Sequence, residues 1–290
     1  MHESFLELLY EFCVNTKEDP ELLEYAEEMC DEHPDTKATA ITELRQMIFD
    51  RQECYPYKTD DEYLLRFLRA RRFVVRLAHK LLVRYCNFRE ENSFLYKRDL
   101  WRLAKVGDIL SSTLRDHPDT GKIIIFRINM WDPKTIHPDE LCAAVTAMME
   151  IGIRQPIIQV FGGILIVDLE GITLKHVTSF TPTTAHRIVC ILGLALPTRV
   201  RSCHVINYSS LVNPFLYVLK KFIPQIYWNR IHLHGNDLQS LHRHIDPVHL
   251  PPKYGGTVPV VSFETWLKKM KIYKDEKFDK DLRDLGFEVK

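Results

Sequence analysis

The sequence predicts an α/β protein in which an N-terminal helical bundle precedes a domain built on a mostly parallel sheet. Over the first hundred residues, apolar side chains recur every three or four positions, which is typical of packed helices. After Gly121, short runs rich in β-branched residues alternate with amphipathic segments, and this order indicates parallel strands joined by crossover helices. We expect three units, over residues 1–105, 106–262 and 263–290.

Each helix expected in the bundle carries an apolar stripe. Asp60 and Asp61 precede the third stripe, at the place where carboxylates stabilise a helix N-terminus. The stripes are Phe5, Leu8, Leu9 and Phe12; Ile41, Leu44 and Ile48; Tyr63, Leu64, Phe67 and Leu68; and Leu77, Leu81, Leu82, Tyr85 and Phe88.

Strands and helices are expected to alternate in the second unit. Thr181 and Pro182 open one of these helices, because threonine is a favoured N-cap and proline fits the first turn. The predicted strands cover residues 122–127, 164–169, 200–207 and 230–234. The predicted helices cover residues 138–153 and 181–195, a segment that starts at 213, and residues 263–273, after which the chain ends in a charged segment.

Composition excludes several classes of protein. Lysine plus arginine equals aspartate plus glutamate, at 39 each, and this neutrality argues against a general nucleic-acid binder. The first twelve residues lack the basic start and apolar core of a secretory signal, and no apolar run reaches the ~18 residues of a membrane span. Seven scattered cysteines without a C-x-x-C pair indicate reduced thiols. We therefore expect a cytoplasmic protein.

Charge is distributed unevenly along the chain. Residues 1–50 hold fourteen acidic and three basic side chains, whereas residues 171–236 hold no aspartate or glutamate. The second stretch is therefore expected to carry a positive potential. Its basic residues are Lys175, Arg187, Arg199, Arg201, Lys220, Lys221 and Arg230.

The sequence carries no signature of catalysis. It contains no G-x-S-x-G, P-loop or G-x-G-x-x-G motif. Asp168 and Glu170 follow a predicted strand, where α/β enzymes often hold catalytic groups. A carboxylate at a strand end also accepts hydrogen bonds from turn N–H groups, and we favour this structural role over hydrolysis. No catalytic residue and no enzymatic activity are expected.

Histidines are the candidates for a metal site. His232 and His234 lie two residues apart on a predicted strand, and therefore on one face of it, with His242 and His244 nearby. No cysteine or carboxylate stands beside them at zinc-like spacing. We expect hydrogen-bonded histidines, with no metal and no cofactor.

The segment after Asn213 is apolar on nearly every helical face and is interrupted only by Lys220 and Lys221. Such a helix is either a central core helix or a lid over an apolar cavity. As a lid it would enter a membrane on opening, with its lysines facing the lipid headgroups. The spacing alone leaves both interpretations open.

Six short motifs occur in the order found in one family. They are LLRFLRARRF at 64–73, INMWDP at 128–133, VDLEG at 167–171, VIN at 205–207, RIHLHGN at 230–236 and LPPKYGG at 250–256. Over about residues 60–260 the sequence resembles the CRAL-TRIO (Sec14-like) lipid-binding family, in the branch of α-tocopherol transfer protein, cellular retinaldehyde-binding protein and the clavesins. The resemblance implies a helical bundle packed on an α/β domain with a closed apolar pocket. It also implies a mobile gate helix, matched here by residues 209–229, and so favours the lid.

The resemblance also implies which residues line the pocket. These are Val145, Met149, Val167, Ile188, Ile191, Leu192, Leu196, Cys203, Val212, Phe215 and Val218. The tocopherol carrier has serines at the positions of Val145 and Met149, which help to hold its ligand. Their replacement here favours a ligand with little polar surface, or one whose polar end binds elsewhere.

Members of the family bind phosphoinositides through a basic cluster outside the pocket. Arg71, Arg199 and Arg230 match three of its positions, while Ile226 and Trp228 replace basic residues of the tocopherol carrier. Lys220 and Lys221 supply compensating charge. Pairing of Arg71 with an acidic residue of the bundle is the alternative.

The function expected is that of an intracellular lipid carrier. It would enclose a tocopherol, retinoid, carotenoid or similar isoprenoid and exchange it during transient, peripheral contact with phosphoinositide-containing membranes. Nucleic acid is not an expected partner. The alternative is a phosphoinositide-binding, lipid-sensing adaptor of membrane trafficking, for which the acidic residues 1–50 would be a docking surface.

Overall fold

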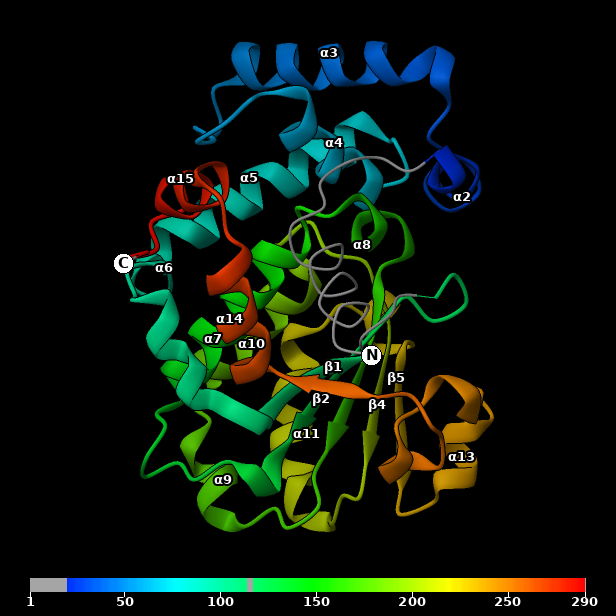
Figure 1. Ribbon diagram of the computed structural model, residues 1–290, viewed down its shortest axis with the longest axis vertical. Coiled ribbons are helices and arrows are strands. Elements are labelled where there is room, and N and C mark those ends of the chain that lie inside the picture. The colour runs from blue at the N-terminus through cyan, green and yellow to red at the C-terminus, as the bar shows by residue number, and fades with distance from the viewer. Residues whose placement is uncertain (1–19, 114–116, 290) are drawn as a thin grey trace.

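The computed structural model describes residues 20–113 and 117–289, so the helix expected over residues 5–12 lies outside the described residues. Helices at one end stand over an α/β unit, and the C-terminal helices pack along its side (Figure 1). Among side chains, those of Leu211, Phe215, Leu219, Ile226 and Tyr273 are also outside the description.

The bundle forms where the apolar stripes predict it. Its helices are α2 (Pro20–Cys30), α3 (Pro34–Arg51), α4 (Asp61–Ala70), α5 (Val75–Glu91) and α6 (Ser93–Tyr96). Asp60 caps α4, since its Oδ1 accepts a 2.9 Å hydrogen bond from the backbone N–H of Tyr63. The buried Arg69 then links the bundle to the second unit, because it pairs with Glu32 and donates a 2.9 Å bond to Oε1 of Gln159.

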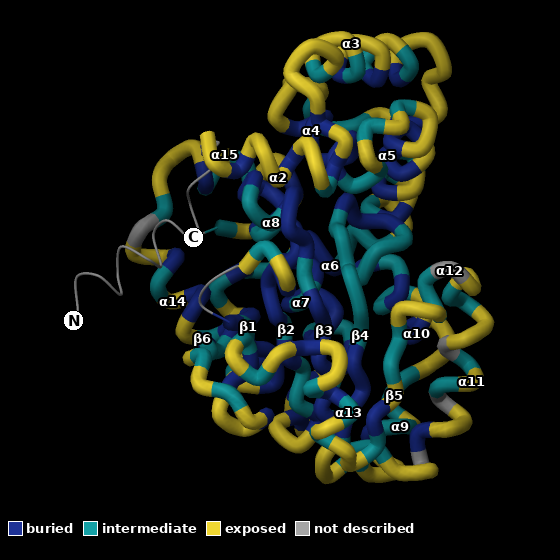
Figure 2. Tube along the Cα trace, turned by 90° about the vertical axis from the view of Figure 1, so that its right-hand side faces the viewer, coloured by how far each residue is buried: buried dark blue, intermediate teal, exposed yellow. Residues whose placement is uncertain are grey.

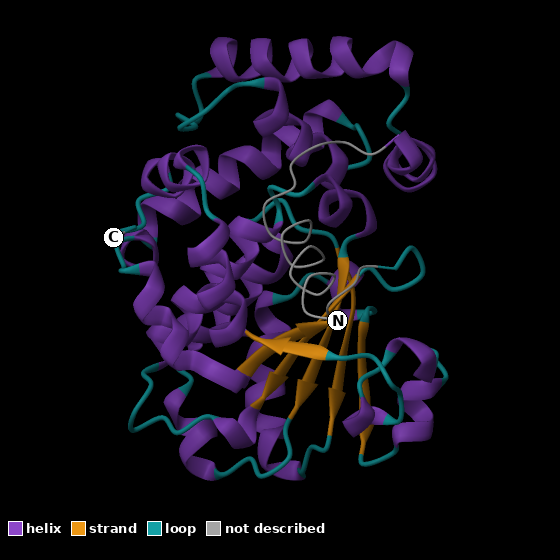
Figure 3. Cartoon of the chain, viewed as in Figure 1, coloured by secondary structure: helices purple, strands orange, loops and turns teal. Residues whose placement is uncertain are grey.

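Six strands form one mostly parallel sheet, in the order β5-β4-β3-β2-β1-β6 (Figure 3). They are β1 (Leu110–Thr113), β2 (Lys122–Arg127), β3 (Gly163–Asp168), β4 (Val200–Ile206), β5 (Ile231–Gly235) and β6 (Val260–Ser262). Strands β2 to β5 are parallel, as predicted, whereas β1 runs antiparallel to β2 and to β6. The sequence interpretation missed β1 and β6, which have only four and three residues.

Alternation along the strands divides the apolar core between the two faces of the sheet. Ile123 and Ile125 of β2 join a smaller cluster with Leu241 of α13 (Leu238–His242). Their neighbours Ile124 and Phe126 face the larger cluster on the opposite side. Only this second face borders the cavity described below.

Helices and short turns cover the second face. They are η1 (Leu100–Ile109), η2 (Ile128–Met130), α7 (Pro138–Gly152), α8 (Pro156–Phe161), α9 (Leu174–Ser179), α10 (Pro182–Val189) and η3 (Cys190–Leu194), followed by η4 (Ser210–Val212), α11 (Asn213–Phe222) and α12 (Gln225–Trp228). The remaining short helices, η5 (Pro247–His249) and η6 (Pro252–Tyr254), precede β6. No described helix is both long enough and apolar enough to cross a membrane.

The gate predicted as one helix over residues 209–229 is interrupted. Ile223 has the extended angles φ −97° and ψ 115°, and Pro224 follows it. Proline restricts the preceding residue to extended backbone and cannot donate to a continuing helix, so α11 and α12 are separate.

The C-terminal segment holds two helices, α14 (Phe263–Tyr273) and α15 (Glu276–Asp284). The first was predicted, and the second lies in the segment expected only to be charged. Phe278 is buried on α15, and Asp281 pairs with Arg154 at 2.7 Å and with Lys58 of the bundle. The charged end therefore fastens the bundle to the α/β unit.

Candidate functional site

An apolar cavity of about 210 Å³ lies between the sheet and the helices that cover its second face. Strands β1 to β5 form its floor. Helices α7 and α10, the turn η3 and the gate segments α11 and α12 form walls, together with residues of η2, of α9 and of the loops that flank α9. All 25 residues that line it are apolar. Such a cavity offers burial to a hydrophobic molecule and no hydrogen bond to a polar one.

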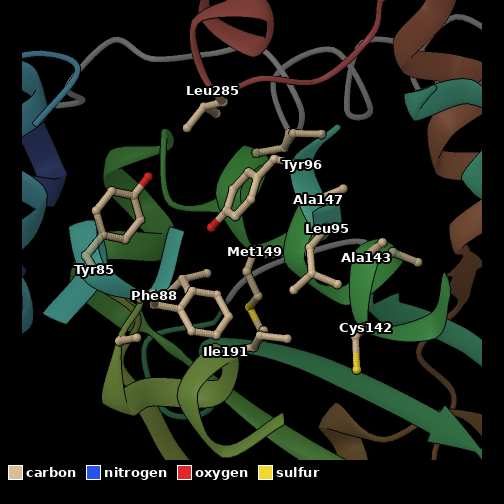
Figure 4. Close-up of a cluster of buried hydrophobic side chains, with 14 of the residues drawn as sticks. Tyr85, Phe88, Leu95, Tyr96, Cys142, Ala143, Ala147, Met149, Ile191 and Leu285 are labelled. Atoms are coloured by element: carbon tan, nitrogen blue, oxygen red, sulfur yellow. The ribbon is translucent and has the colours of Figure 1, made fainter. Parts of the chain in front are cut away.

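Seven of the eleven predicted pocket residues line this cavity. They are Val145, Met149, Val167, Ile188, Ile191, Leu192 and Cys203. The structure places Leu196 and Val212 within the neighbouring core, fully buried but away from the lining, and Val218 on α11 at a partly buried position. The side chain of Phe215 lies outside the described residues. Figure 4 shows the core next to the cavity, with Met149 and Ile191 among side chains of α5, α6 and α7.

Other lining residues were missed by the sequence interpretation. Ile124 and Phe126 of β2 and Leu165 of β3 line the floor, and strand alternation relative to Val167 would have identified Leu165. On the gate side, the lining residues are Leu216, Ile223 and Trp228. Trp228, which the resemblance placed among the positions of a basic cluster, therefore gives the cavity an apolar wall.

The gate lies at the surface of the molecule, with exposed and half-buried residues along α11 and α12 (Figure 2). Both of its lysines are exposed and stand over aromatic rings of the gate itself. Nζ of Lys220 is 5.3 Å from the ring centroid of Trp228, and Nζ of Lys221 is 4.6 Å from that of Tyr217. His186 of α10 packs against Phe222, with 5.2 Å between ring centroids.

Four of the seven basic residues in the stretch without acids have acidic or backbone-carbonyl partners within the protein. Lys175 pairs with Asp132 at 2.6 Å, and Arg187 pairs with Asp139 at 2.7 Å. Arg199 donates to the backbone carbonyls of Val160 and, at 2.9 Å, Met29, and Arg201 donates to that of Pro118 at 2.7 Å. Within the described part of the chain, Lys220, Lys221 and Arg230 have no acidic partner within 4 Å.

Arg71 lies near two further arginines. Burial lowers the pKa of the Arg71 guanidinium, and the positive charges of Arg84 and Arg230 lower it further. Tyr227 has the opposite effect. Its Nη2 is buried and has no hydrogen-bond partner among the described residues. The sequence left open that Arg71 pairs with an acidic residue of the bundle. In the structure it is the next residue, Arg72, that makes such a pair, with Asp31 at 3.1 Å. Arg84 was missed by the sequence interpretation, since only the fold brings it close to Arg71.

Asp168 is fully buried at the end of β3, and its carboxylate has four partners. Lys253, Asn207 and Tyr254 contact it at 2.7, 2.9 and 2.9 Å, and the backbone N–H of Glu170 donates to it at 3.1 Å. Burial alone would raise the pKa of Asp168, but these hydrogen bonds outweigh burial and lower it. The arrangement is the structural role expected for this carboxylate.

Four histidines form a cluster on the α13 side of the sheet. His204 and His234 are joined at 2.9 Å between Nδ1 and Nε2, and Ser202 and Ser240 bind their other nitrogens at 2.8 Å. The rings of His232 and His244 pack beside them, 4.1 Å apart. These are the hydrogen-bonded histidines expected for the strand. Within the described residues, metal-ligand geometry is met by a different group, His117, Asp119 and His249.

An α/β unit that encloses an apolar cavity beneath an interrupted surface helix defines a lipid-binding protein. The chain belongs to the CRAL/TRIO family of lipid-binding transfer proteins. The model of the CRAL/TRIO domain matches residues 116–256, and that of the CRAL/TRIO, N-terminal domain matches residues 9–84.

Several curated relatives are similar over most of their length. Clavesin-2 of Rattus norvegicus and of Homo sapiens are each 31% identical over 268 residues, which cover 90% of this chain and 81% of theirs. Clavesin-1 of Xenopus laevis is 31% identical over 257 residues, covering 87% of this chain and 77% of its own. Among solved structures, the crystal structure of Sfh5 has a TM-score of 0.47 at 14% identity and covers 84% of this chain and 99% of its own.

Proposed function

We propose that this protein is a non-enzymatic intracellular carrier. It encloses one small hydrophobic molecule, such as a tocopherol, retinoid, carotenoid or other isoprenoid, and exchanges it during peripheral, transient contact with phosphoinositide-containing membranes. The observation that carries the proposal is the 210 Å³ cavity with its wholly apolar lining. The engagement of Asp168 by four partners supports the absence of hydrolytic chemistry at the strand end.

The energetics of the cavity favour a hydrophobic cargo. Each 100 Å² of apolar ligand surface transferred from water contributes about 2.5 kcal/mol. A charged headgroup in the same space would lose its hydration without gaining a partner, which is strongly unfavourable. Apolar walls discriminate weakly between cargoes, at ~1–3 kcal/mol per methylene.

We place the membrane contact on the surface that joins the gate to the bundle. Its cations are Arg71, Arg84, Lys220, Lys221 and Arg230, and the like charges of Arg84 and Arg230 beside Arg71 support an anionic ligand here. Arg84 takes the place predicted for Arg199, whose guanidinium is bound to backbone carbonyls.

The two gate segments would admit the cargo. Leu216, Ile223 and Trp228 close the cavity from this side, so displacement of α11 and α12 exposes it. The same movement would present the apolar inner face of the gate to the membrane interior, with the lysines near the headgroups.

Native mass spectrometry of the full-length protein, before and after organic extraction, tests the carrier function. We expect an extractable hydrophobic molecule in nearly stoichiometric amount, and rebinding of an isoprenoid by the extracted protein. Transfer of the bound molecule between vesicles is then measured with and without a phosphoinositide in the acceptor vesicles. The comparison distinguishes the contribution of the pocket from that of the membrane contact. A protein that is empty as purified and takes up neither isoprenoid nor phospholipid would contradict the proposal.

A further inference from the structure

Two side chains of the connection between β1 and β2 meet a third from the segment that leads into β6. His117 and Asp119 belong to the first segment, and His249, in η5, belongs to the second. One possible ligand atom from each residue lies within 4.8 Å of the other two. Among the described residues, it is this group that meets the distances of a metal site. None of the three residues lines the apolar cavity.

The sheet brings these two segments together. Strand β1 runs antiparallel to β6, and Thr113, its last residue, is the register partner of Val260, the first residue of β6. The chain that leaves β1 and the chain that enters β6 are therefore neighbours, although they are far apart in the sequence. No local pattern indicates this meeting of His117 with His249.

The backbone that carries the three side chains is fixed on both sides. Arg201 donates a 2.7 Å hydrogen bond to the carbonyl of Pro118, the residue between the first two ligands. In η5, the backbone N–H of His249 donates to the carbonyl of Asp246 at 3.0 Å, and the next residue, Leu250, is fully buried. Binding of an ion therefore requires movement only of the side chains.

The tripeptide His-Pro-Asp occurs three times in the chain, at residues 33–35, 117–119 and 137–139. In the last two copies, Nδ1 of the histidine accepts a 3.2 Å hydrogen bond from the backbone N–H of the aspartate and lies 3.6 Å from its carboxylate. The proximity of these two side chains is thus a local property of the tripeptide. The copy at 117–119 is distinguished by a second imidazole, because the ring centroids of His117 and His249 are 4.2 Å apart.

We propose that His117, Asp119 and His249 bind a zinc ion. Two imidazoles and one carboxylate are a ligand set that zinc accepts, with water in the fourth position. Imidazole ligands favour zinc over magnesium and calcium, which bind through oxygen atoms. Zinc bonds of about 2.0–2.1 Å place tetrahedral ligand atoms about 3.4 Å apart, so each side chain has to move by about 1 Å.

The surroundings of the group determine how tightly an ion would be held. The side chains of His117 and Asp119 are 48% and 76% exposed, so they are free to rotate toward an ion. Asp119 also acts through its charge on Arg201, and this nearby cation opposes the binding of a dication. We therefore expect binding that follows the zinc concentration. The bound ion would link the β1–β2 connection to the segment before β6.

Isothermal titration calorimetry of the full-length protein, treated with a chelator and then titrated with zinc chloride, tests the proposal. We expect saturable binding of zinc and a higher thermal midpoint in its presence, because an ion bound by the folded chain stabilises it. Magnesium chloride at the same concentration should have neither effect. His249→Gln removes one ligand and should weaken zinc binding by about tenfold or more.

His137→Gln is the matched control, because it alters the same tripeptide at a copy for which the described residues provide no third ligand. Its zinc affinity should equal that of the unmodified protein. Asp119→Asn, at an exposed carboxylate, replaces His249→Gln if that variant does not fold, and it should also weaken binding.

His244→Gln examines the other group of imidazoles, the four-histidine cluster, and should leave zinc binding unchanged. Loss of binding in this variant together with full binding in His249→Gln would overturn the proposal, as would an unmodified protein that binds no zinc. Because the three proposed ligands lie outside the apolar cavity, either result leaves the carrier function untouched.

Discussion

The hydroxyl of Tyr254 donates a 2.9 Å hydrogen bond to Oδ2 of Asp168, across 86 positions of the chain. Lys253 and Asn207 contact the same carboxylate. The motifs VDLEG, VIN and LPPKYGG therefore meet at one buried group, which locks the ends of β3 and β4 to the loop before β6.

Replacement of this carboxylate should destabilise the fold. In Asp168→Ala the buried donors lose their acceptor, and we expect a loss of about 3 kcal/mol in the free energy of unfolding. Tyr254→Phe removes one hydrogen bond and should cost about 1 kcal/mol. Urea denaturation at neutral pH measures both. An Asp168→Ala protein of unchanged stability that lacks only an activity would favour a catalytic role.

Filling the apolar cavity should abolish binding without unfolding the protein. Val145→Phe places a larger apolar side chain into the space, so bound cargo should disappear from the native mass spectrum while the thermal midpoint of the extracted protein stays within a few degrees. Val248→Phe, at a valine that is 59% exposed, is the matched control and should retain its cargo. Retention of cargo by Val145→Phe would place the ligand elsewhere.

Removal of charge from the gate should weaken membrane binding. Each lysine near an anionic bilayer contributes about 1 kcal/mol, so Lys220→Gln with Lys221→Gln should lower the partition coefficient onto phosphoinositide vesicles roughly thirtyfold. The effect should shrink as salt is added. Lys175→Gln changes the same charge at a lysine paired with Asp132 and should have little effect. Vesicle cosedimentation provides the comparison. Equal losses of membrane binding in both variants would show that the gate lysines are not part of the membrane contact.

The histidine cluster should make the protein sensitive to mild acid. Burial, and then the neighbouring histidines, lowers the pKa of His204 from 6.5 to about 3. Below about pH 6.5 the unfolded chain therefore binds a proton that the folded chain refuses, and stability should fall progressively from there toward pH 3. Urea denaturation between pH 7 and pH 4 should give a smaller decline for His204→Gln than for the unmodified chain. The exposed His33, replaced in the same way, should leave the decline unchanged.

Much of the fold follows from local patterns in the sequence, because long runs of β-branched residues and long apolar stripes form strands and helices wherever they are buried. Strand β1 (LSST) is short and partly polar, so its place depends on pairing with β2 and β6, which no local pattern encodes. The break at Pro224, in contrast, was marked by the proline itself.

The candidate site was predictable only in part, for a related reason. The pocket positions, Val145 and Met149 among them, were predicted from the family resemblance, and periodicity adds only that these two residues share a helix face. The cavity also takes walls from Leu110, Phe180 and Ile231, which come from three distant segments and meet only after folding. Likewise, whether an arginine is available to a ligand depends on its partners in space. Arg199 is bound to backbone carbonyls, whereas Arg84 is exposed.

The apolar lining of the cavity has a consequence for the stability and turnover of the protein. The 25 residues that line it are apolar and offer water no hydrogen bond, so we expect water not to fill the space when the cargo leaves. A ligand that binds only the folded chain adds stability that grows with its concentration. For a carrier of this kind, chains without cargo would unfold and be degraded sooner, and the cellular abundance of the protein would follow the supply of the lipid that it carries.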